Sequence, residues 1–212
     1  MEKLRVLVAC EYSGTVRDAF SALGHYAISC DLLPTDSPGN HHQGDIFEVI
    51  DDGFDLMVAH PPCTHLAVSG ARHFHKKQKE QAEALDFVRR LMAANIRHIA
   101  IENPVSIISS KIRKPDQIIQ PWMFGDPFQK TTCLWLKELP NLTPTKIVDK
   151  GAFHEWVDKK TGKKKRQAVW DMEAFKKGVD RGKVRSKTFQ GIADAMAQQW
   201  SAHVVTVKAG SP

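Results

Sequence analysis

The stretch Phe54-Asp55-Leu56-Met57-Val58-Ala59-His60-Pro61-Pro62-Cys63 decides the fold. Its apolar part predicts a buried strand that ends just before the two prolines. The stretch His98-Ile99-Ala100-Ile101-Glu102-Asn103-Pro104 has the same pattern, in which an apolar run is followed by polar residues. Parallel strands deliver the residues after their carboxyl ends to one edge of a sheet. We therefore expect the Cys63 thiol and the Glu102 carboxyl to share a cleft at that edge.

Further strands and helices are predicted on both sides of these two runs. In the first helix, Val16, Phe20 and Leu23 recur at helical spacing. The predicted strands are 4–10, 26–30, a short one near 43–46, 54–59, 98–101 and 131–136, and the predicted helices are 14–23, about 76–94 and 188–203. Strands that alternate with helices in this order predict an α/β fold, with a mostly parallel sheet and helices on both faces.

The chain length fits one core domain with an insertion. At 212 residues the sequence is long enough for a full hydrophobic core, and 42% of it is hydrophobic. We expect a core at 1–139, a basic insertion at 140–187, and a C-terminal helix and tail at 188–212 that return to the core. The formal charge of +6 is compatible with a polyanionic partner, although many basic soluble proteins have such a charge.

The four cysteines are widely spaced and form no Cys-x-x-Cys pair, so neither a metal site nor a disulfide framework is expected. The first predicted strand starts close to the N-terminus, without the apolar segment of a signal peptide. No later stretch approaches the length of a membrane span. We expect a cytoplasmic protein with no membrane partner.

Cys63 and Glu102 suit chemistry on a pyrimidine ring, in which one carbon is attacked while a ring nitrogen is protonated. Two prolines hold the nucleophile on a stiff segment, because each fixes its own φ and restricts the residue before it. Burial is expected to raise the pKa of Glu102, so that it holds a proton at neutral pH. The alternatives are a small buried cysteine and a glutamate in a surface ion pair.

The turn Glu11-Tyr12-Ser13-Gly14 follows the first strand, where a doubly wound sheet binds a nucleotide-like cofactor. Asp31, at the end of the second strand, is placed to bind ribose hydroxyls, and Asp45 is placed to meet an adenine edge. Either acid could instead cap a helix.

The basic insertion contains the run Lys159–Arg166. It predicts either a two-stranded ribbon around the turn 160–163, which would contact DNA, or a solvated loop. In the first case, the nucleic-acid-binding residues are Lys163, Lys164, Lys165 and Arg166.

Four short motifs occur in the order Gly44-Asp45-Ile46, Pro62-Cys63, Ser69-Gly70 and Glu102-Asn103-Pro104. This ordered set resembles the cytosine-5 DNA methyltransferases. The resemblance implies a Rossmann-like methyltransferase fold that uses S-adenosylmethionine, with S-adenosylhomocysteine as the product, and a segment 64–75 that closes over a flipped cytosine. Cys63 and Glu102 would be catalytic. The implied cofactor-binding residues are Glu11, Tyr12, Ser13, Gly14, Asp31, Asp45 and Pro61, and the implied substrate-binding residues are Pro62, Ser69, Gly70, Arg72, Asn103, Gln129 and Lys130.

The chain also departs from this family. Its opening glycine motif is reduced, Lys130 stands near the place of an expected arginine, and Gln190-Gly191 keeps only the glycine of the last motif. The insertion 140–187 replaces a full target-recognition domain. We expect a monomer acting on duplex DNA in a bacterial or phage-infected cytoplasm, with a helper protein or a dimer as alternatives.

Three other activities compete with this hypothesis. They are an RNA or free-nucleotide cytosine methyltransferase, a module that binds S-adenosylmethionine or nucleic acid without turnover, and an amino-directed methyltransferase. The last ranks low because Cys63 stands where such sites place an aromatic residue after Pro-Pro.

Overall fold

The computed structural model describes residues 2–168, 176, 178 and 180–210, and within these residues seven strands form one sheet in the order β3-β2-β1-β4-β5-β7-β6. β1 to β5 are parallel to one another, and β7 runs antiparallel to both β5 and β6. The strands are β1 Arg5–Ala9, β2 Tyr26–Asp31, β3 His41–Gln43, β4 Leu56–Ala59, β5 His98–Pro104, β6 Gln117–Ile119 and β7 Thr132–Lys137. The predicted mostly parallel sheet is confirmed.

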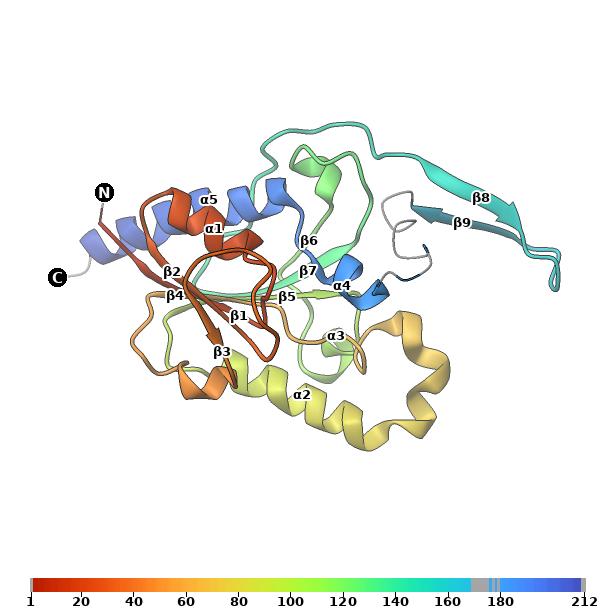
Figure 1. Ribbon diagram of the computed structural model, residues 1–212, viewed down its shortest axis with the longest axis horizontal. Helices are drawn as coiled ribbons and strands as arrows, with labels where there is room; N and C mark the ends of the chain where they lie inside the picture. Colours follow the sequence, from red (N-terminus) through yellow and green to blue (C-terminus); the bar gives the residue numbers. More distant parts are fainter. Residues whose placement is uncertain (1, 169–175, 177, 179, 211–212) are drawn as a thin grey trace.

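Helices cover both faces of the sheet (Figure 1). α1 and α5 lie on one face, and α2 lies on the other. The α-helices are α1 Thr15–Ala22, α2 Gln78–Met92, α3 Ile108–Lys111, α4 Arg181–Ser186 and α5 Gln190–Ala209, and the 3-10 helices are η1 Ile46–Glu48, η2 Val68–Lys76 and η3 Pro121–Met123.

Alternation along the strands divides the core between these two faces. In β1, Val6 and Val8 pack with α1 and α5, whereas Leu7 and Ala9 pack with α2. Successive side chains of a strand point to opposite faces, so an unbroken apolar run supplies both layers at once. Trp200 of α5 is fully buried in the first layer, as its place on the apolar face of the predicted helix requires.

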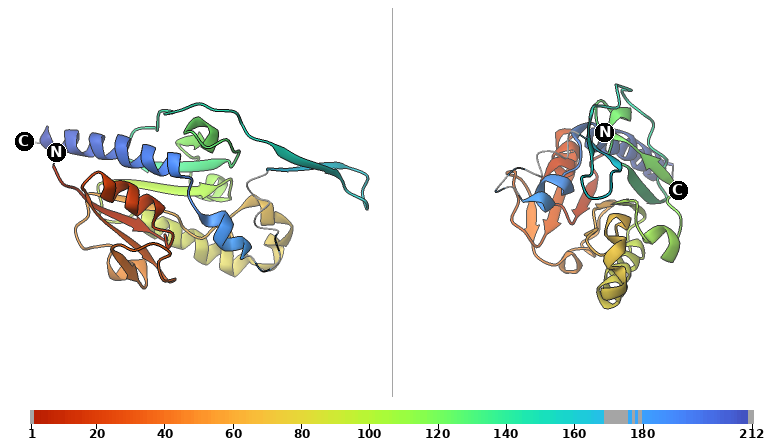
Figure 2. Two further views of the ribbon diagram at one scale, coloured as in Figure 1. Left: turned by 45° about the horizontal axis from the view of Figure 1, so that its top comes forward. Right: turned by 90° about the vertical axis from the view of Figure 1, so that its right-hand side faces the viewer.

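The predicted insertion has two parts in the described structure. Near its start, the chain packs on the core: Leu142 is buried, and the indole of Trp200 donates a hydrogen bond to the Pro140 carbonyl, at 3.0 Å. Farther on, β8 Phe153–Val157 and β9 Lys164–Ala168 pair antiparallel in a separate two-stranded sheet. This ribbon extends from the end of the molecule opposite the termini (Figure 2). The rest of the insertion includes residues 169–175, 177 and 179, which lie outside the described residues, and the domain boundaries stay a prediction.

Candidate active site

The carboxyl ends of β1 and β4 lie side by side in the middle of the sheet. The strand order reverses between them, since the chain builds β2 and β3 on one side of β1 and adds β4 and β5 on the other. In an open α/β sheet, ligands bind outside such a reversal. The turn Cys10–Gly14 follows β1 and the segment His60–Cys63 follows β4, so both flank the expected crevice.

The segment after β4 is fixed at both ends. The His60 amide donates to the Ala9 carbonyl at 2.9 Å, which continues the pairing of β4 with β1. The buried Asn103 side chain donates to the Pro61 carbonyl at 2.8 Å, and the Ala67 amide donates to the Cys63 carbonyl at 2.8 Å. Cys63 is therefore an exposed residue on a rigid connection between a strand end and a tight turn.

Glu102 lies in β5 and contacts His60. The His60 Nδ1 and the Glu102 Oε2 are 3.1 Å apart, and the two side chains are only 9% and 15% exposed. Burial raises the pKa of Glu102, but the hydrogen bond and charge of His60, together with Lys130, outweigh it, and the pKa lies below its ordinary value. The expectation of a raised pKa is thus wrong, because the sequence did not reveal that His60 faces the carboxyl. Glu102 is ionised at neutral pH.

Two cations lie near the Cys63 thiol. Burial raises its pKa, as does Glu102, whereas a backbone hydrogen bond, Lys130 and Arg185 lower it without cancelling the rise. Lys130, in the segment before β7, donates to the Arg185 carbonyl at 2.9 Å. The structure therefore brings a thiol, a carboxylate and two cations from four parts of the chain to one place. His60 and Arg185 were not predicted as site residues.

The predicted cofactor turn is largely engaged with its own helix. Glu11 is 5% exposed, and its carboxylate accepts hydrogen bonds from the Val16 amide at 2.7 Å and the Arg17 amide at 3.2 Å. The Ser13 hydroxyl donates to the same carboxylate at 3.2 Å, and the Tyr12 hydroxyl donates to the carbonyl of Lys183 in α4 at 3.0 Å. The negative charge of Glu11 thus already occupies the N-terminus of α1, and Gly14 completes the turn with a φ of 76°.

The two predicted acids lie at one edge of the sheet. Burial, Asp31 and Asp45 together raise the pKa of Cys30 to about 12. Asp45 caps η1 by accepting from the Phe47 amide at 3.0 Å, which is the alternative role considered for it, and Asp31 accepts from the Leu33 amide at 2.9 Å. Leu32, which follows Asp31, is 74% exposed and forms apolar surface beside the acid. Leu32 was not predicted as a site residue, although the sequence shows an apolar pair, Leu32-Leu33, directly after the acid at the end of the strand.

The remaining predicted residues lie in the segment after β4, in η2, in the segment before β7 and in the ribbon. Ser69, Gly70 and Arg72 lie in η2, which a bridge between Ala67 and Ser106 joins to the segment after β5. Gln129 precedes Lys130, and Pro62 is exposed beside Cys63. The predicted nucleic-acid-binding residues 163–166 belong to the turn and the first half of β9, in the projecting ribbon.

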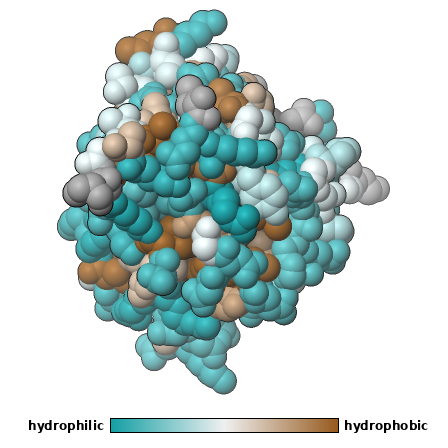
Figure 3. Space-filling view, turned by 90° about the vertical axis from the view of Figure 1, so that its left-hand side faces the viewer, coloured by the Kyte–Doolittle hydropathy of each residue, from teal (hydrophilic) through white to brown (hydrophobic). Residues whose placement is uncertain are grey.

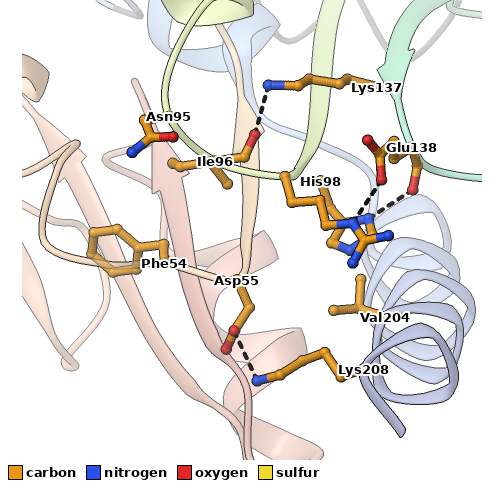
Figure 4. A pocket seen from close by; sticks show the side chains of 10 residues that line it. Phe54, Asp55, Asn95, Ile96, His98, Lys137, Glu138, Val204 and Lys208 are labelled. Carbon is orange, nitrogen blue, oxygen red and sulfur yellow. Dashed lines mark hydrogen bonds and ion pairs between the residues drawn. The ribbon is translucent and has the colours of Figure 1, made fainter. Parts of the chain in front are cut away.

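A hollow of about 450 Å³ lies at the opposite edge of the sheet from Cys63. Its charged side chains bind one another or the backbone: Arg97 pairs with Glu138 at 2.7 Å, and Lys208 pairs with Asp55 at 2.9 Å (Figure 4). The surface at the end of the molecule that carries the termini is mostly hydrophilic, with scattered apolar patches (Figure 3). Because these charges are already paired, this hollow is a weaker candidate than the edge with Cys63.

Comparison with solved structures finds methyltransferases. A candidate DNA modification methyltransferase encoded within an E. coli prophage has a TM-score of 0.49 and 15% identity, over 69% of this chain and 52% of that one. A methyltransferase of Entamoeba histolytica has a TM-score of 0.48 and 16% identity, over 70% and 58%. A mutant of Spodoptera frugiperda DNMT2 has a TM-score of 0.44 and 15% identity, over 74% and 62%.

The chain thus matches about half to three fifths of the length of these structures. No family model matches it, and no curated protein matches it in sequence. Within the described residues, no helix is long and apolar enough to cross a membrane, and no three His, Cys, Asp or Glu side chains gather as a metal site would require.

Proposed function

We propose that the chain is an S-adenosylmethionine-dependent methyltransferase that modifies carbon 5 of cytosine in DNA. The observation that carries this proposal is the exposed Cys63 thiol close to the partly buried Glu102 carboxylate, at the carboxyl edge of the sheet. A module that only binds has no need of a nucleophile held rigidly beside a carboxylate.

Each group has a defined task in this reaction. The Cys63 thiolate would add to carbon 6: its electron pair forms the new sulfur–carbon bond while the ring electrons move to N3, which takes up a proton from water. Carbon 5 would then bond to the methyl group, and loss of the carbon 5 proton to water would return electrons to the ring as the sulfur–carbon bond breaks. Lys130 and Arg185 favour the thiolate, since both lower the pKa of Cys63. Glu102, which is ionised, would accept hydrogen bonds from the protonated N3 and from the exocyclic amine of the base. Because carbon 6 is inaccessible in a stacked duplex, the base must leave the helix, and the segment 64–75 is placed to close over it.

The residues at the β1 and β2 edge fit a cofactor without phosphate groups. A helix N-terminus attracts anions, but Glu11 already fills that of α1, so a phosphate there would meet a buried carboxylate. S-adenosylmethionine has no phosphate, and when bound it supplies a methyl group made electrophilic by its sulfonium. Asp31 would accept hydrogen bonds from the ribose hydroxyls, and the exposed Leu32 would cover the adenine ring.

The ribbon β8–β9 is proposed as the DNA contact. Lys163, Lys164 and Arg166 are exposed on it, and such side chains bind phosphates without reading sequence. Their replacement by alanine should weaken duplex binding and reduce the slope of log affinity against log salt by roughly 0.9 for each lost phosphate contact. Fluorescence anisotropy at several salt concentrations measures this slope. Replacement of Lys79 and Lys111, exposed lysines of α2 and α3, is the control, and equal effects of both sets would contradict the assignment.

The test of the activity is mass spectrometry of nucleosides. Cells that lack cytosine methylation would express the chain or its Cys63→Ser variant, and both DNA and RNA would be digested. A rise of 5-methylcytosine in DNA that disappears in the variant is the expected result. A rise in RNA alone would assign the polymer differently, and no rise in either would contradict the proposed reaction.

A further inference from the structure

The side chain of Tyr12 joins the turn after β1 to α4, a helix from the other end of the chain. Its hydroxyl donates to the Lys183 carbonyl at 3.0 Å and lies 2.9 Å from the Ser186 hydroxyl, from which it can accept a hydrogen bond. The Lys183 ammonium lies 5.4 Å from the centre of the Tyr12 ring, so the ring adds a cation–π contact. Tyr12 is only 7% exposed, so these contacts are largely shielded from water.

α4 depends on such contacts for its position. It has six residues, and a helix this short is not stable by itself in water. A second contact reaches it from the loop after β2: Lys187, which follows α4, pairs with Asp36 at 3.1 Å, and the Asp36 amide donates to the Tyr12 carbonyl at 2.8 Å. Both side chains of that ion pair are exposed, so the pair contributes little. Of these two contacts, the one made by the Tyr12 hydroxyl is therefore the main anchor of α4.

The same segment also holds a cation close to the nucleophile. The Lys130 ammonium donates to the Arg185 carbonyl at 2.9 Å and to the Lys187 carbonyl at 3.1 Å. It also lies 5.8 Å from the ring centre of Phe189, two residues farther along the chain. Arg185 is itself a residue of α4. One short helix and the residues that follow it therefore place both cations that favour the Cys63 thiolate.

We propose that Tyr12 is a positioning residue for the nucleophile: through α4 it holds Lys130 and Arg185 where they stabilise the Cys63 thiolate. This role differs from the one expected from the sequence, in which Tyr12 would bind the cofactor. The inference rests on the proposed function, because it concerns the nucleophile of that reaction. The reactivity of the thiol can nevertheless be measured without cofactor or nucleic acid.

Three charged groups act on the Cys63 thiol from three parts of the chain. Burial and Glu102 of β5 raise its pKa, whereas Lys130, before β7, and Arg185 of α4 lower it. The net pKa is raised, so the reactivity of the thiol near neutral pH depends on the small fraction that is present as thiolate. Glu102 lies in a central strand and does not move with α4. Displacement of α4 would therefore remove only the two favourable charges, and the thiolate fraction would fall.

The test is the pH dependence of Cys63 alkylation by iodoacetamide in Tyr12→Phe, which removes the hydroxyl and keeps the ring. Tyr26→Phe is the matched control: Tyr26 is the only other tyrosine, and its ring contacts Arg5, the first residue of β1. Mass spectrometry of the modified peptide gives the rate at each pH. The midpoint of the pH profile reports thiolate formation, and its plateau at high pH reports access to the thiol. The profile thus separates a loss of the two charges from an opening of the site.

We expect Tyr12→Phe to move the midpoint to higher pH and to slow alkylation near neutral pH by about threefold, which corresponds to the loss of one modest hydrogen bond. Tyr26→Phe should stay within about 1.5-fold of the unchanged protein. In a background of Lys130→Met and Arg185→Met, Tyr12→Phe should change the rate by less than about 1.5-fold, because the groups that it positions are gone. An unchanged midpoint in folded Tyr12→Phe, or the same shift in that background, would overturn the inference. Ser186→Ala, which removes the second hydrogen bond of the Tyr12 hydroxyl, replaces Tyr12→Phe if the latter does not fold.

The kinetics of methyl transfer separate this role from cofactor binding. If Tyr12 positions the two cations, Tyr12→Phe should lower kcat by about threefold and leave the KM for S-adenosylmethionine within about twofold. A raised KM with an unchanged kcat would make Tyr12 a cofactor ligand and would overturn the inference. If the unchanged protein transfers no methyl group, the proposed function fails, and the alkylation profile alone decides the role of Tyr12.

Discussion

Replacement of Glu11 tests whether this residue serves the fold or the cofactor. Its carboxylate accepts hydrogen bonds from the Val16 and Arg17 amides, at 2.7 and 3.2 Å, and caps α1 from outside the helix. Gly14 stands at the N-cap and has no side chain to do so. We expect Glu11→Ala to destabilise the protein because two amides at a buried helix end lose a charged acceptor.

The size of the effect follows from these contacts. A hydrogen bond to a charged group contributes about 1.5–3 kcal/mol, and water can enter the vacated space and restore part of the loss. Loss of both contacts should therefore lower the free energy of unfolding by about 3 kcal/mol. For a domain of this length, the Tm should fall by roughly 6–12 °C.

Thermal unfolding followed by circular dichroism measures this change. Glu83→Ala, which removes an exposed acid of α2, is the matched control and should stay within about 0.5 kcal/mol of the unchanged protein. A Glu11→Ala variant that keeps its Tm but loses affinity for S-adenosylmethionine in calorimetry would refute this reasoning, since Glu11 would then be a ligand rather than a cap.

Two further predictions concern the site. The pKa of Cys63 is raised, so the rate of its alkylation by iodoacetamide should increase as the pH rises above the ordinary thiol pKa. At a fixed pH, Glu102→Gln should speed the reaction and Lys130→Met should slow it, because Glu102 raises this pKa and Lys130 lowers it. Mass spectrometry of the modified peptide measures these rates. Equal rates in the two variants would contradict the charge arrangement. Asn103→Leu should lower the free energy of unfolding, measured by urea denaturation, by about 2 kcal/mol. The reason is that the buried Pro61 carbonyl loses its hydrogen-bond donor. The exposed Asn141→Leu should not, and similar losses in both would contradict this.

The central fold was predictable because its elements have strong periodic signals. The apolar runs that became β1, β4 and β5 supply both core layers, and the apolar face of α5 was evident around Trp200. β6, of three residues, and η2 have no comparable pattern, because short elements depend on neighbours distant in the chain. α5 extends beyond the predicted 188–203 to Ala209, since Val204 continues its buried face.

The site was predictable in position but not in charge. Strand-end placement alone brings Cys63 and Glu102 to one edge of a parallel sheet. The protonation of Glu102 depends instead on His60 and Lys130, and no spacing rule reveals which side chains face a carboxyl across a sheet. Arg185 was hidden for the same reason: it reaches the site because the Tyr12 hydroxyl and the Lys130 ammonium bind the backbone of α4 and the residue after it.

The distribution of charge separates the two ligands that the proposed reaction needs. Glu11, Asp31 and Asp45 line the edge at β1 and β2, and Asp31 and Asp45 raise the pKa of Cys30 there. Lys130 and Arg185 lie near Cys63, which follows β4. A nucleic-acid backbone is repelled from the first side and attracted to the second. The polymer would therefore approach Cys63 from the side of α4, which leaves the acidic edge to a cofactor that carries positive charge and no phosphate.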